Sequence, residues 1–222
     1  MKRTPLLCAA ALSCSLLASA TPTLISGTPG NAILATPTGP SLRFSQIINF
    51  DELTPNTTLD PSQYSSQGVA SISSPNGLTV IPFSTQSAPN EIFDNGANGT
   101  ATISLKLSHG TNEIGIGIAD ADPVTVTLQP LDLNGSPFGS AFSVTIPADT
   151  DNPFNAYYAI ADTGYTIGGL EVLQTSADPS FSGLAIDDLQ VGPIPEPASL
   201  LLAGAGFVAF GLICLQKRRN KK

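Results

Sequence analysis

Two pairs of adjacent acidic residues are the side chains best suited to chemistry in this chain. Asp51 and Glu52 stand near the beginning of its central part, and Asp187 and Asp188 stand near the end. Oxygen atoms are the ligands that Ca²⁺ takes in proteins, and the two ends of a domain often lie close together. The four carboxylates are therefore candidate ligands of a structural Ca²⁺. The alternative is that both pairs are solvated strand ends.

The apolar pattern changes parity at each acidic pair. Successive side chains of a strand point to opposite faces, so the apolar residues of one strand should keep one parity. The residues that reveal the change are Phe44, Ile48, Phe50 and Leu53 around the first pair, and Leu184, Ile186, Leu189 and Val191 around the second. This pattern predicts a β-bulge or a strand end at each pair, which could turn all four carboxylates to one rim.

Nucleophiles and bases are scarce between the two pairs, which argues against catalysis. The chain has one histidine, His109, which precedes a glycine in a predicted loop, and its cysteines are Cys8, Cys14 and Cys214 near the chain ends. It has no Gly-x-Ser-x-Gly elbow. We predict no catalytic residue. A glycan-active enzyme built from two carboxylates, as in glycoside hydrolases, is the alternative.

Tyrosines are the candidate sugar platform, since tryptophan is absent. Tyr157 and Tyr158 are neighbours in a predicted strand, so one should face inward and the other outward. Tyr64 and Tyr165 stand beside polar turns. We favour packing at the edges of the core over sugar binding for these rings.

Short strands must position these side chains, because apolar and polar residues alternate with a period of two through residues 41–191. The expected strands cover residues 43–50, 68–73, 78–83, 102–107, 113–119, 124–129, 142–146, 155–161, 166–174 and 183–191. Turn residues such as Asn134-Gly135 separate them, and no helical periodicity interrupts them. We predict an all-β fold: one antiparallel two-sheet β-sandwich, jelly-roll-like, with nine or ten strands.

The segment from Glu113 to Ala119 has an unusual composition. Its isoleucines take one face, and glycine or alanine takes the other. A bare face of this kind predicts that another backbone or a large neighbouring side chain lies close over it.

The N-terminal residues 1–20 have the three parts of a secretory signal peptide. Lys2 and Arg3 precede an apolar stretch, and the small residues Ala18 and Ala20 predict cleavage after Ala20 by signal peptidase. Residues 21–40 are rich in Thr, Pro and Gly and predict a flexible lead-in. Leu24 and Ile25 could add a short edge strand to the domain.

The C-terminal residues 192–222 form three parts in a fixed order. The triplet Pro195, Glu196 and Pro197 comes first, and the uncharged apolar run 198–215 follows. As a helix this run is about 27 Å long, enough to cross a thin bilayer core once. The basic end at 217–222 comprises Lys217, Arg218, Arg219, Lys221 and Lys222. Positive charge stays on the cytoplasmic side, so the β-domain should lie outside.

At these residues the chain resembles the PEP-CTERM sorting signal of Gram-negative and related bacteria. The resemblance implies that exosortase, a multipass membrane protease of bacteria that make extracellular polysaccharide, cuts near the triplet. The domain body also resembles outer domains found upstream of this tail, at residues 48–53, 63–69, 124–146 and 184–189. Such domains are similar in fold to carbohydrate-binding modules.

Charge and cysteine usage restrict the partners. Between residues 21 and 196 the chain has 17 acids and two bases, a net charge of −15, and no cysteine. Such a polyanion repels nucleic acid and attracts divalent cations. No disulfide framework can form in this part of the chain.

Together these features predict an exported protein of the cell surface or extracellular matrix, with the inner membrane as an intermediate location. We expect a non-catalytic binding or structural module associated with exopolysaccharide. The glycan-active enzyme is the alternative. An ice-binding protein is the third reading, for which the sequence offers one Thr-x-Thr, Thr125-Val126-Thr127.

Overall fold

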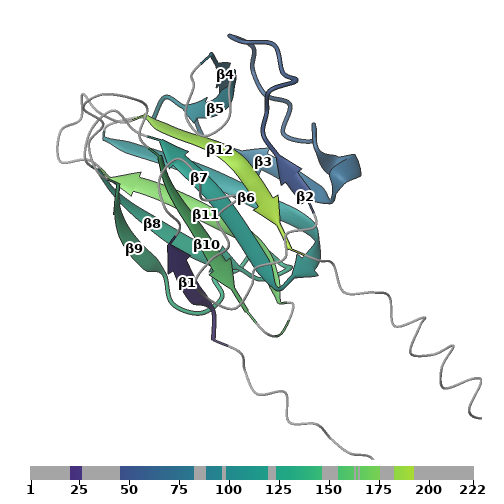
Figure 1. The fold of residues 1–222 in the computed structure, drawn as a ribbon, viewed down its shortest axis with the longest axis vertical. Coiled ribbons are helices and arrows are strands. Elements are labelled where there is room, and N and C mark those ends of the chain that lie inside the picture. Colours follow the sequence, from purple (N-terminus) through teal and green to yellow (C-terminus); the bar gives the residue numbers. More distant parts are fainter. Residues whose placement is uncertain are drawn as a thin grey trace, which may run out of the picture.

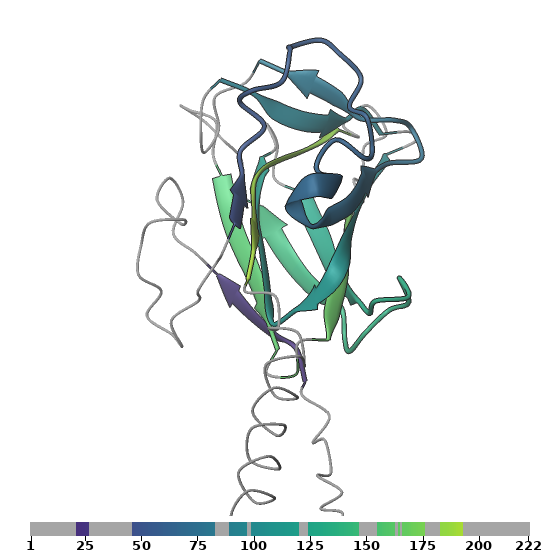
Figure 2. The same ribbon diagram turned by 90° about the vertical axis from the view of Figure 1, so that its right-hand side faces the viewer.

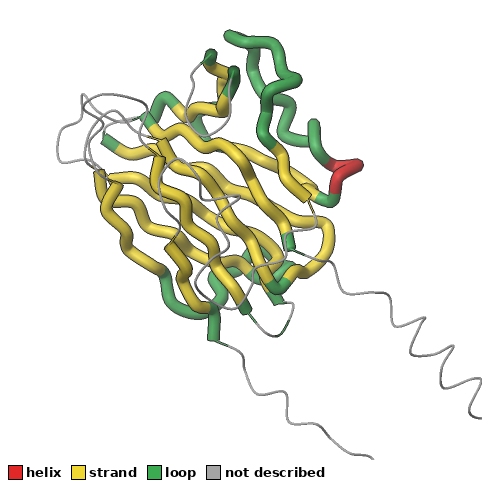
Figure 3. The backbone as a smooth tube through the Cα atoms, in the orientation of Figure 1, coloured by secondary structure: helices red, strands yellow, loops and turns green. Residues whose placement is uncertain are grey.

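The structure is a computed structural model that describes residues 21–26, 46–82, 89–96, 99–119, 124–146, 155–162, 164, 166–175 and 183–192. In these ranges it has twelve strands and one short 3-10 helix, η1 (Ser65–Gln67). Figures 1 and 3 show how these elements are arranged. The predicted signal peptide, the Pro-Glu-Pro triplet, the apolar run and the basic end all lie outside these ranges. Within them, no helix has the length and apolarity needed to cross a membrane.

Seven strands form the first sheet, in the order β1-β10-β7-β12-β5-β4, with β2 also paired to β12. Their bounds are β1 (Thr23–Ser26), β2 (Gln46–Ile48), β4 (Thr79–Ile81), β5 (Glu91–Asp94), β7 (Glu113–Ala119), β10 (Asn155–Ala161) and β12 (Leu184–Val191). All of the pairings in this sheet are antiparallel.

Five strands form the second sheet, in the order β3-β6-β11-β8-β9, again antiparallel. Their bounds are β3 (Val69–Ser73), β6 (Thr100–Thr111), β8 (Val124–Leu131), β9 (Phe142–Ile146) and β11 (Ile167–Thr175). Figure 2 views the two layers from the side. The predicted all-β two-sheet sandwich is confirmed.

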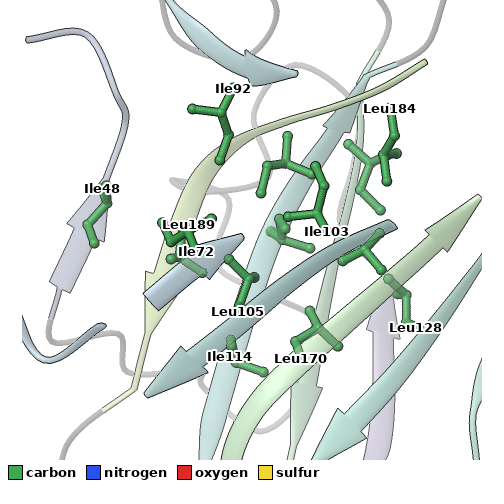
Figure 4. Packing of buried hydrophobic residues seen from close by; sticks show 14 of the residues in the cluster. Ile48, Ile72, Ile92, Ile103, Leu105, Ile114, Leu128, Leu170, Leu184 and Leu189 are labelled. Atoms are coloured by element: carbon green, nitrogen blue, oxygen red, sulfur yellow. The ribbon is translucent and has the colours of Figure 1, made fainter. Parts of the chain in front are cut away.

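Alternate residues of the strands fill the core between the two sheets. Ile114 and Ile116 of β7 are fully buried, as are Ile103 and Leu105 of β6 on the opposite sheet. Figure 4 shows such side chains meeting between the layers. Burying each one stabilises the fold by roughly 1.5–3 kcal/mol. Because a one-residue slip would expose a whole set of them, the pattern also determines the register of each strand.

Two predicted elements differ from those in the structure. His109 lies within β6 and is exposed there, so its predicted place in a loop is wrong. The pairing of β6 with β11 is irregular here: it stops at Lys106 opposite Gly169 and resumes at Thr111 opposite Ile167, so His109 lies in the irregular part of the strand. Twelve strands in the described ranges also exceed the predicted nine or ten.

The extra strands are short. β5 was not expected, because Glu91 and Asp94 at its ends obscure the apolar alternation. β1 contains Leu24 and Ile25 and pairs with β10 at the edge of the sheet. The domain therefore begins within the segment predicted as a lead-in, and the suggested edge strand at these two residues is confirmed.

Candidate functional site on the outer face of the seven-stranded sheet

A β-bulge interrupts β12 at the second acidic pair. Asp187 lies opposite Gly117 of β7, and Gln190 lies opposite Gly115, so three steps along β12 match two along β7. Asp188 takes a left-handed backbone conformation with φ of 47°, and its N–H donates to Asp187 Oδ1 at 2.7 Å. Aspartate tolerates this conformation better than most residues. The bulge predicted from the change of parity is confirmed.

The bulge decides which side chains of β12 face outward. Before it, Leu184 and Ile186 point into the core, and after it Leu189 does so, and all three are fully buried. Each bulge adds one residue and reverses the alternation. Gln190 is thereby placed on the outer face of the sheet, although an unbroken alternation would direct it into the core.

On this outer face, a tyrosine from β10 reaches across β7 to the glutamine of β12. The Tyr157 hydroxyl donates to Gln190 Oε1 at 2.6 Å. Because β7 lies between the two strands, the backbones are two strand spacings apart, about 10 Å. Tyr157 is directly opposite Gly117, and Gln190 is opposite Gly115. The two glycines leave room for the ring, which is the large neighbouring side chain predicted for the bare face of residues 113–119.

We refer to Tyr157, Gln190, Gly115 and Gly117 as the bridge face. Burial raises the pKa of the Tyr157 hydroxyl well above its ordinary value, and the negative charges of Asp188 and then Glu113 raise it further. The hydroxyl therefore keeps its proton at physiological pH. It acts as a hydrogen-bond donor and not as a base.

Gln190 contributes a second donor to the bridge face. The residue is 1% exposed, and its Nε2 has no hydrogen-bond partner. Turning the amide over would exchange the two atoms, but the Tyr157 hydroxyl can meet only one of them. In either orientation one buried polar atom of this amide is unsatisfied, at a cost of about 1–3 kcal/mol.

The chemistry available to the bridge face is hydrogen bonding over an aromatic ring. Across the described part of the chain, no three His, Cys, Asp or Glu side chains gather as metal ligands. His109 Nδ1 meets the hydroxyl of its neighbour Ser108 at 2.8 Å on the exposed part of β6. That hydroxyl also donates to Gly68 O at 3.0 Å. This arrangement lies on the other sheet, away from the bridge face.

The first acidic pair serves to hold a turn. Asp51 accepts hydrogen bonds from Asn49 Nδ2 at 2.6 Å and from the Asn90 N–H at 3.3 Å. Glu52 accepts from the Tyr64 hydroxyl at 2.7 Å. The ring of Tyr64 meets that of Phe50 edge to face, with centroids 5.5 Å apart. Each carboxylate thus bonds to its own side-chain donor beside the core.

The four carboxylates do not converge on one rim, which corrects the expectation from the sequence. The backbones are close, because β2 pairs with β12 through Ile48 and Leu189. Asp51 and Glu52 lie in a turn after β2, whereas Asp187 and Asp188 are buried inside β12. Among the described residues, no three His, Cys, Asp or Glu side chains are placed to hold one metal ion, so the four carboxylates do not form a common ligand set. Calcium binding itself stays a prediction.

The remaining tyrosines fit the packing role that the sequence favoured. Tyr158 is half-buried and packs against the core, while Tyr157 lies on the outer face, so the predicted division is confirmed. Tyr64 is 2% exposed at the edge of the core. Tyr165, the triplet at 195–197, the basic end and the cleavage residues Ala18 and Ala20 lie outside the described residues.

Sequence reasoning missed Gln190. Its only local signal was a polar residue between Leu189 and Val191 in the last strand. The bare face at Gly115 and Gly117 predicts a large neighbour but does not identify the residues of β10 and β12 that meet over it.

Comparison with known protein families identifies the end of the chain. Residues 193–219 match the PEP-CTERM protein-sorting motif. The match begins at the residue after Gly192, the last described residue of the sandwich. No curated protein matches the chain.

Solved structures with related folds include carbohydrate-binding modules and a glycosidase. The arabinose-bound α-L-arabinofuranosidase MgGH51 is 13% identical over 69% of this chain and 27% of its own, with a TM-score of 0.45. The family 22 carbohydrate-binding module of Clostridium thermocellum Xyn10B is 12% identical over 68% of this chain and 94% of its own, with a TM-score of 0.38. The xylan-binding domain of Paenibacillus barcinonensis Xyn10C is 14% identical over 72% of this chain and 99% of its own, with a TM-score of 0.40.

The enzymes among these structures are much larger than this chain. The chain spans 27% of the arabinofuranosidase and 21% of the active domain of the bacteriophage CBA120 tailspike protein. At such identities and TM-scores, the likeness assigns no ligand and no activity to this chain.

Proposed function

We propose that this chain is an exported, non-catalytic protein of the cell surface or extracellular matrix that exosortase processes near Pro195-Glu196-Pro197. The observation that carries the proposal is the sorting motif at residues 193–219, directly after the last strand of a folded β-sandwich. Signal peptide 1–20 starts export, and the apolar run 198–215 holds the chain in the inner membrane until processing.

The arrangement of the two chain ends supports this route. β1 begins and β12 ends at the same end of the first sheet, because Thr23 pairs with Ala161, Ala161 pairs with Glu113, and Gly192 N–H donates to Glu113 O. A chain held in the membrane by both terminal segments can therefore fold its sandwich on one side of the bilayer.

Alanines in place of Pro195, Glu196 and Pro197 test the processing step. The variant should remain in the inner membrane at the mass of the unprocessed chain, whereas the control Pro193→Ala, just outside the triplet, should be processed normally. Fractionation and mass spectrometry of both variants in a host with exosortase provide the measurement. A triplet variant with wild-type mass and location would refute the proposal.

The ligand that we propose for the domain is exopolysaccharide, because the sorting motif at residues 193–219 resembles a signal used by bacteria that make extracellular polysaccharide. The bridge face is not the binding surface that we propose, because Tyr157 and Gln190 are 3% and 1% exposed and join two strands of the sheet. Polysaccharide pull-down with the processed protein should succeed, whereas a resin without polysaccharide, the control, should retain none of it. Hydrolysis of any glycan would favour the enzyme alternative.

One observation bears on the ice-binding alternative. Across four strands of the second sheet, four threonines stand side by side, although the sequence shows no repeat; they are Thr145, Thr125, Thr175 and Thr100. Sheets twist by about 20–25° per strand, so this row turns by roughly 60–75° from end to end. A twisted row matches a flat crystal face poorly, and we rank this function below polysaccharide binding. Thermal hysteresis in a freezing assay would reverse that order.

A further inference from the structure

The end of the sandwich from which both chain ends leave is defined by a row of residues. Thr23, Ala161, Glu113 and Gly192 follow one another across β1, β10, β7 and β12. At about 4.8 Å per strand, Thr23 and Gly192 are about 14 Å apart. Figure 2 shows the start of β1 and the end of β12 at the same end of the molecule. We call this the proximal end.

The last residue of the row is held firmly. Gly192 N–H donates to Glu113 O at 2.8 Å. A Cβ placed on Gly192 would lie 2.8 Å from Glu113 Cβ and 2.9 Å from Thr111 Oγ1, so the backbone is pressed against the turn between β6 and β7. The folded part of the chain therefore extends fully to Gly192.

Little chain separates this point from the predicted membrane span. Residues 193–197 lie between Gly192 and Ala198, where the apolar run begins. Fully extended at about 3.3–3.6 Å per residue, this stretch reaches only about 20 Å. The proximal end is therefore held close to the membrane for as long as the chain is unprocessed.

The turn after β8 lies at the proximal end and presents an apolar side chain. Leu133 is 55% exposed; the one other large apolar residue so exposed in the described ranges is Ile47. The connection between β8 and β9 reaches the start of β1, because a Cβ on Gly139 would lie 2.9 Å from Pro22 Cδ. An exposed leucine alone needs no explanation, but this one stands beside the chain ends that lead to the bilayer.

The turn at residues 132–136, which we call the Leu133 turn, is rigid, and the Lys106 side chain lies beneath it. Asp132 accepts from the N–H groups of Asn134 and Ser136, each at 2.8 Å, which also holds the pKa of its carboxyl below the ordinary value. A Cβ on Gly135 would lie 3.0 Å from Lys106 Cε. Lys106 is the sole lysine or arginine among the described residues. A leucine with a lysine stem below it suits the boundary between headgroups and acyl chains.

We propose that the Leu133 turn contacts the lipid surface while the chain is anchored. This inference rests on the proposed anchoring by residues 198–215. A tether of about 20 Å raises the effective concentration of the surface to the millimolar range, so a contact of low intrinsic affinity is populated. The contact would hold the sandwich with its proximal end against the membrane and its β4–β5 end pointing away from it.

The absence of tryptophan from the sequence allows a clean test. Leu133→Trp is introduced into the full-length chain, which is reconstituted in phosphatidylcholine vesicles with and without bromine-labelled lipid. Thr79→Trp is the matched control, because Thr79 is exposed and lies far from the proximal end. It pairs with Phe93, which pairs with Ala185 near the start of β12, whereas the proximal end is at the end of β12. Ala185 is six residues from Val191, about 20 Å along the strand.

Labelled lipid should reduce the emission of Trp at position 133 and leave that at position 79 unchanged. Asn134→Trp on the same turn gives a second reporter if Leu133→Trp alters the fold. Equal emission with and without label at both turn positions overturns the contact. Flotation with the vesicles separates the two proposals: a chain that floats without quenching refutes only the contact, and a chain that does not float refutes the anchoring and the contact together.

Discussion

Removing the hydroxyl of Tyr157 tests the bridge across β7. Tyr157→Phe keeps the ring over the glycines but removes the donor to Gln190 Oε1. The amide of Gln190, 1% exposed, would then have neither oxygen nor nitrogen paired. Leaving a buried polar atom without its partner costs about 1–3 kcal/mol, and we take about 2 kcal/mol as the expected loss in the free energy of unfolding. At about 2–4 °C per kcal/mol, Tm should fall by about 4–8 °C.

The adjacent residue gives the matched control. Tyr158→Phe removes the same atom, but the Tyr158 hydroxyl makes an exposed contact of 3.5 Å with Thr145 O. We expect a change within about 0.5 kcal/mol, as for most surface substitutions. Thermal and urea unfolding of the full-length chain in detergent, followed by circular dichroism, measure both variants.

A double variant separates the hydrogen bond from general disturbance. Replacing both partners of a buried hydrogen bond with apolar groups is often nearly neutral, so Gln190→Leu should recover most of the stability lost in Tyr157→Phe. The coupling energy of this cycle should be about 1–2 kcal/mol. Equal losses for Tyr157→Phe and Tyr158→Phe, or additive effects in the cycle, would refute the bridge.

Three further predictions follow from the same structure. The pKa of the Tyr157 hydroxyl is raised in the folded state, so this tyrosine ionises in the unfolded chain at a lower pH, about 10, than in the folded chain. Its contribution to stability is therefore complete below pH about 10 and is lost as the pH rises above that value. The stability of Tyr157→Phe should fall less steeply with rising alkaline pH than that of the unchanged chain. Gly169→Ala should lower stability by about 1–3 kcal/mol, because its Cβ would lie 2.2 Å from Leu105 O, and a melt with no change would contradict this. Calcium binding by the acidic pairs stays a prediction, which a thermal melt with Ca²⁺ and with Mg²⁺ at matched ionic strength decides. A larger rise of Tm with Ca²⁺ that is absent from Asp187→Asn would support the site, and equal rises would refute it.

The strands could be predicted because their signal is local. Alternation over five to seven residues gave the bounds of β7, β9 and β10 as the structure has them. The same reasoning located the bulge in β12, since a change of parity inside one strand has few other causes. It failed for β5, whose four residues include two acids and carry no clear period.

Local reasoning of this kind predicted the two glycines of the bridge face. Gly115 and Gly117 had to lie beneath something large, because a face without side chains cannot pack by itself. The identity of the large group was not predictable, because Tyr157 and Gln190 are 33 residues apart and meet only when β10 and β12 flank β7. The failure of the carboxylates to converge has the same origin, since proximity of two backbones does not determine where side chains point.

The sequence by itself determined the period of the strands, the place of the bulge and the position of the C-terminal sorting motif, because each depends on residues that are near one another in the chain. Tertiary structure alone decided which strands are neighbours. Asp94 illustrates the difference: nothing local distinguishes it, yet it is fully buried and accepts from Thr102 N–H at 2.8 Å, Gly96 N–H at 2.9 Å and Asn76 Nδ2 at 3.1 Å. A buried charge is tolerated only where such donors converge, and their convergence is a property of the assembled sheets.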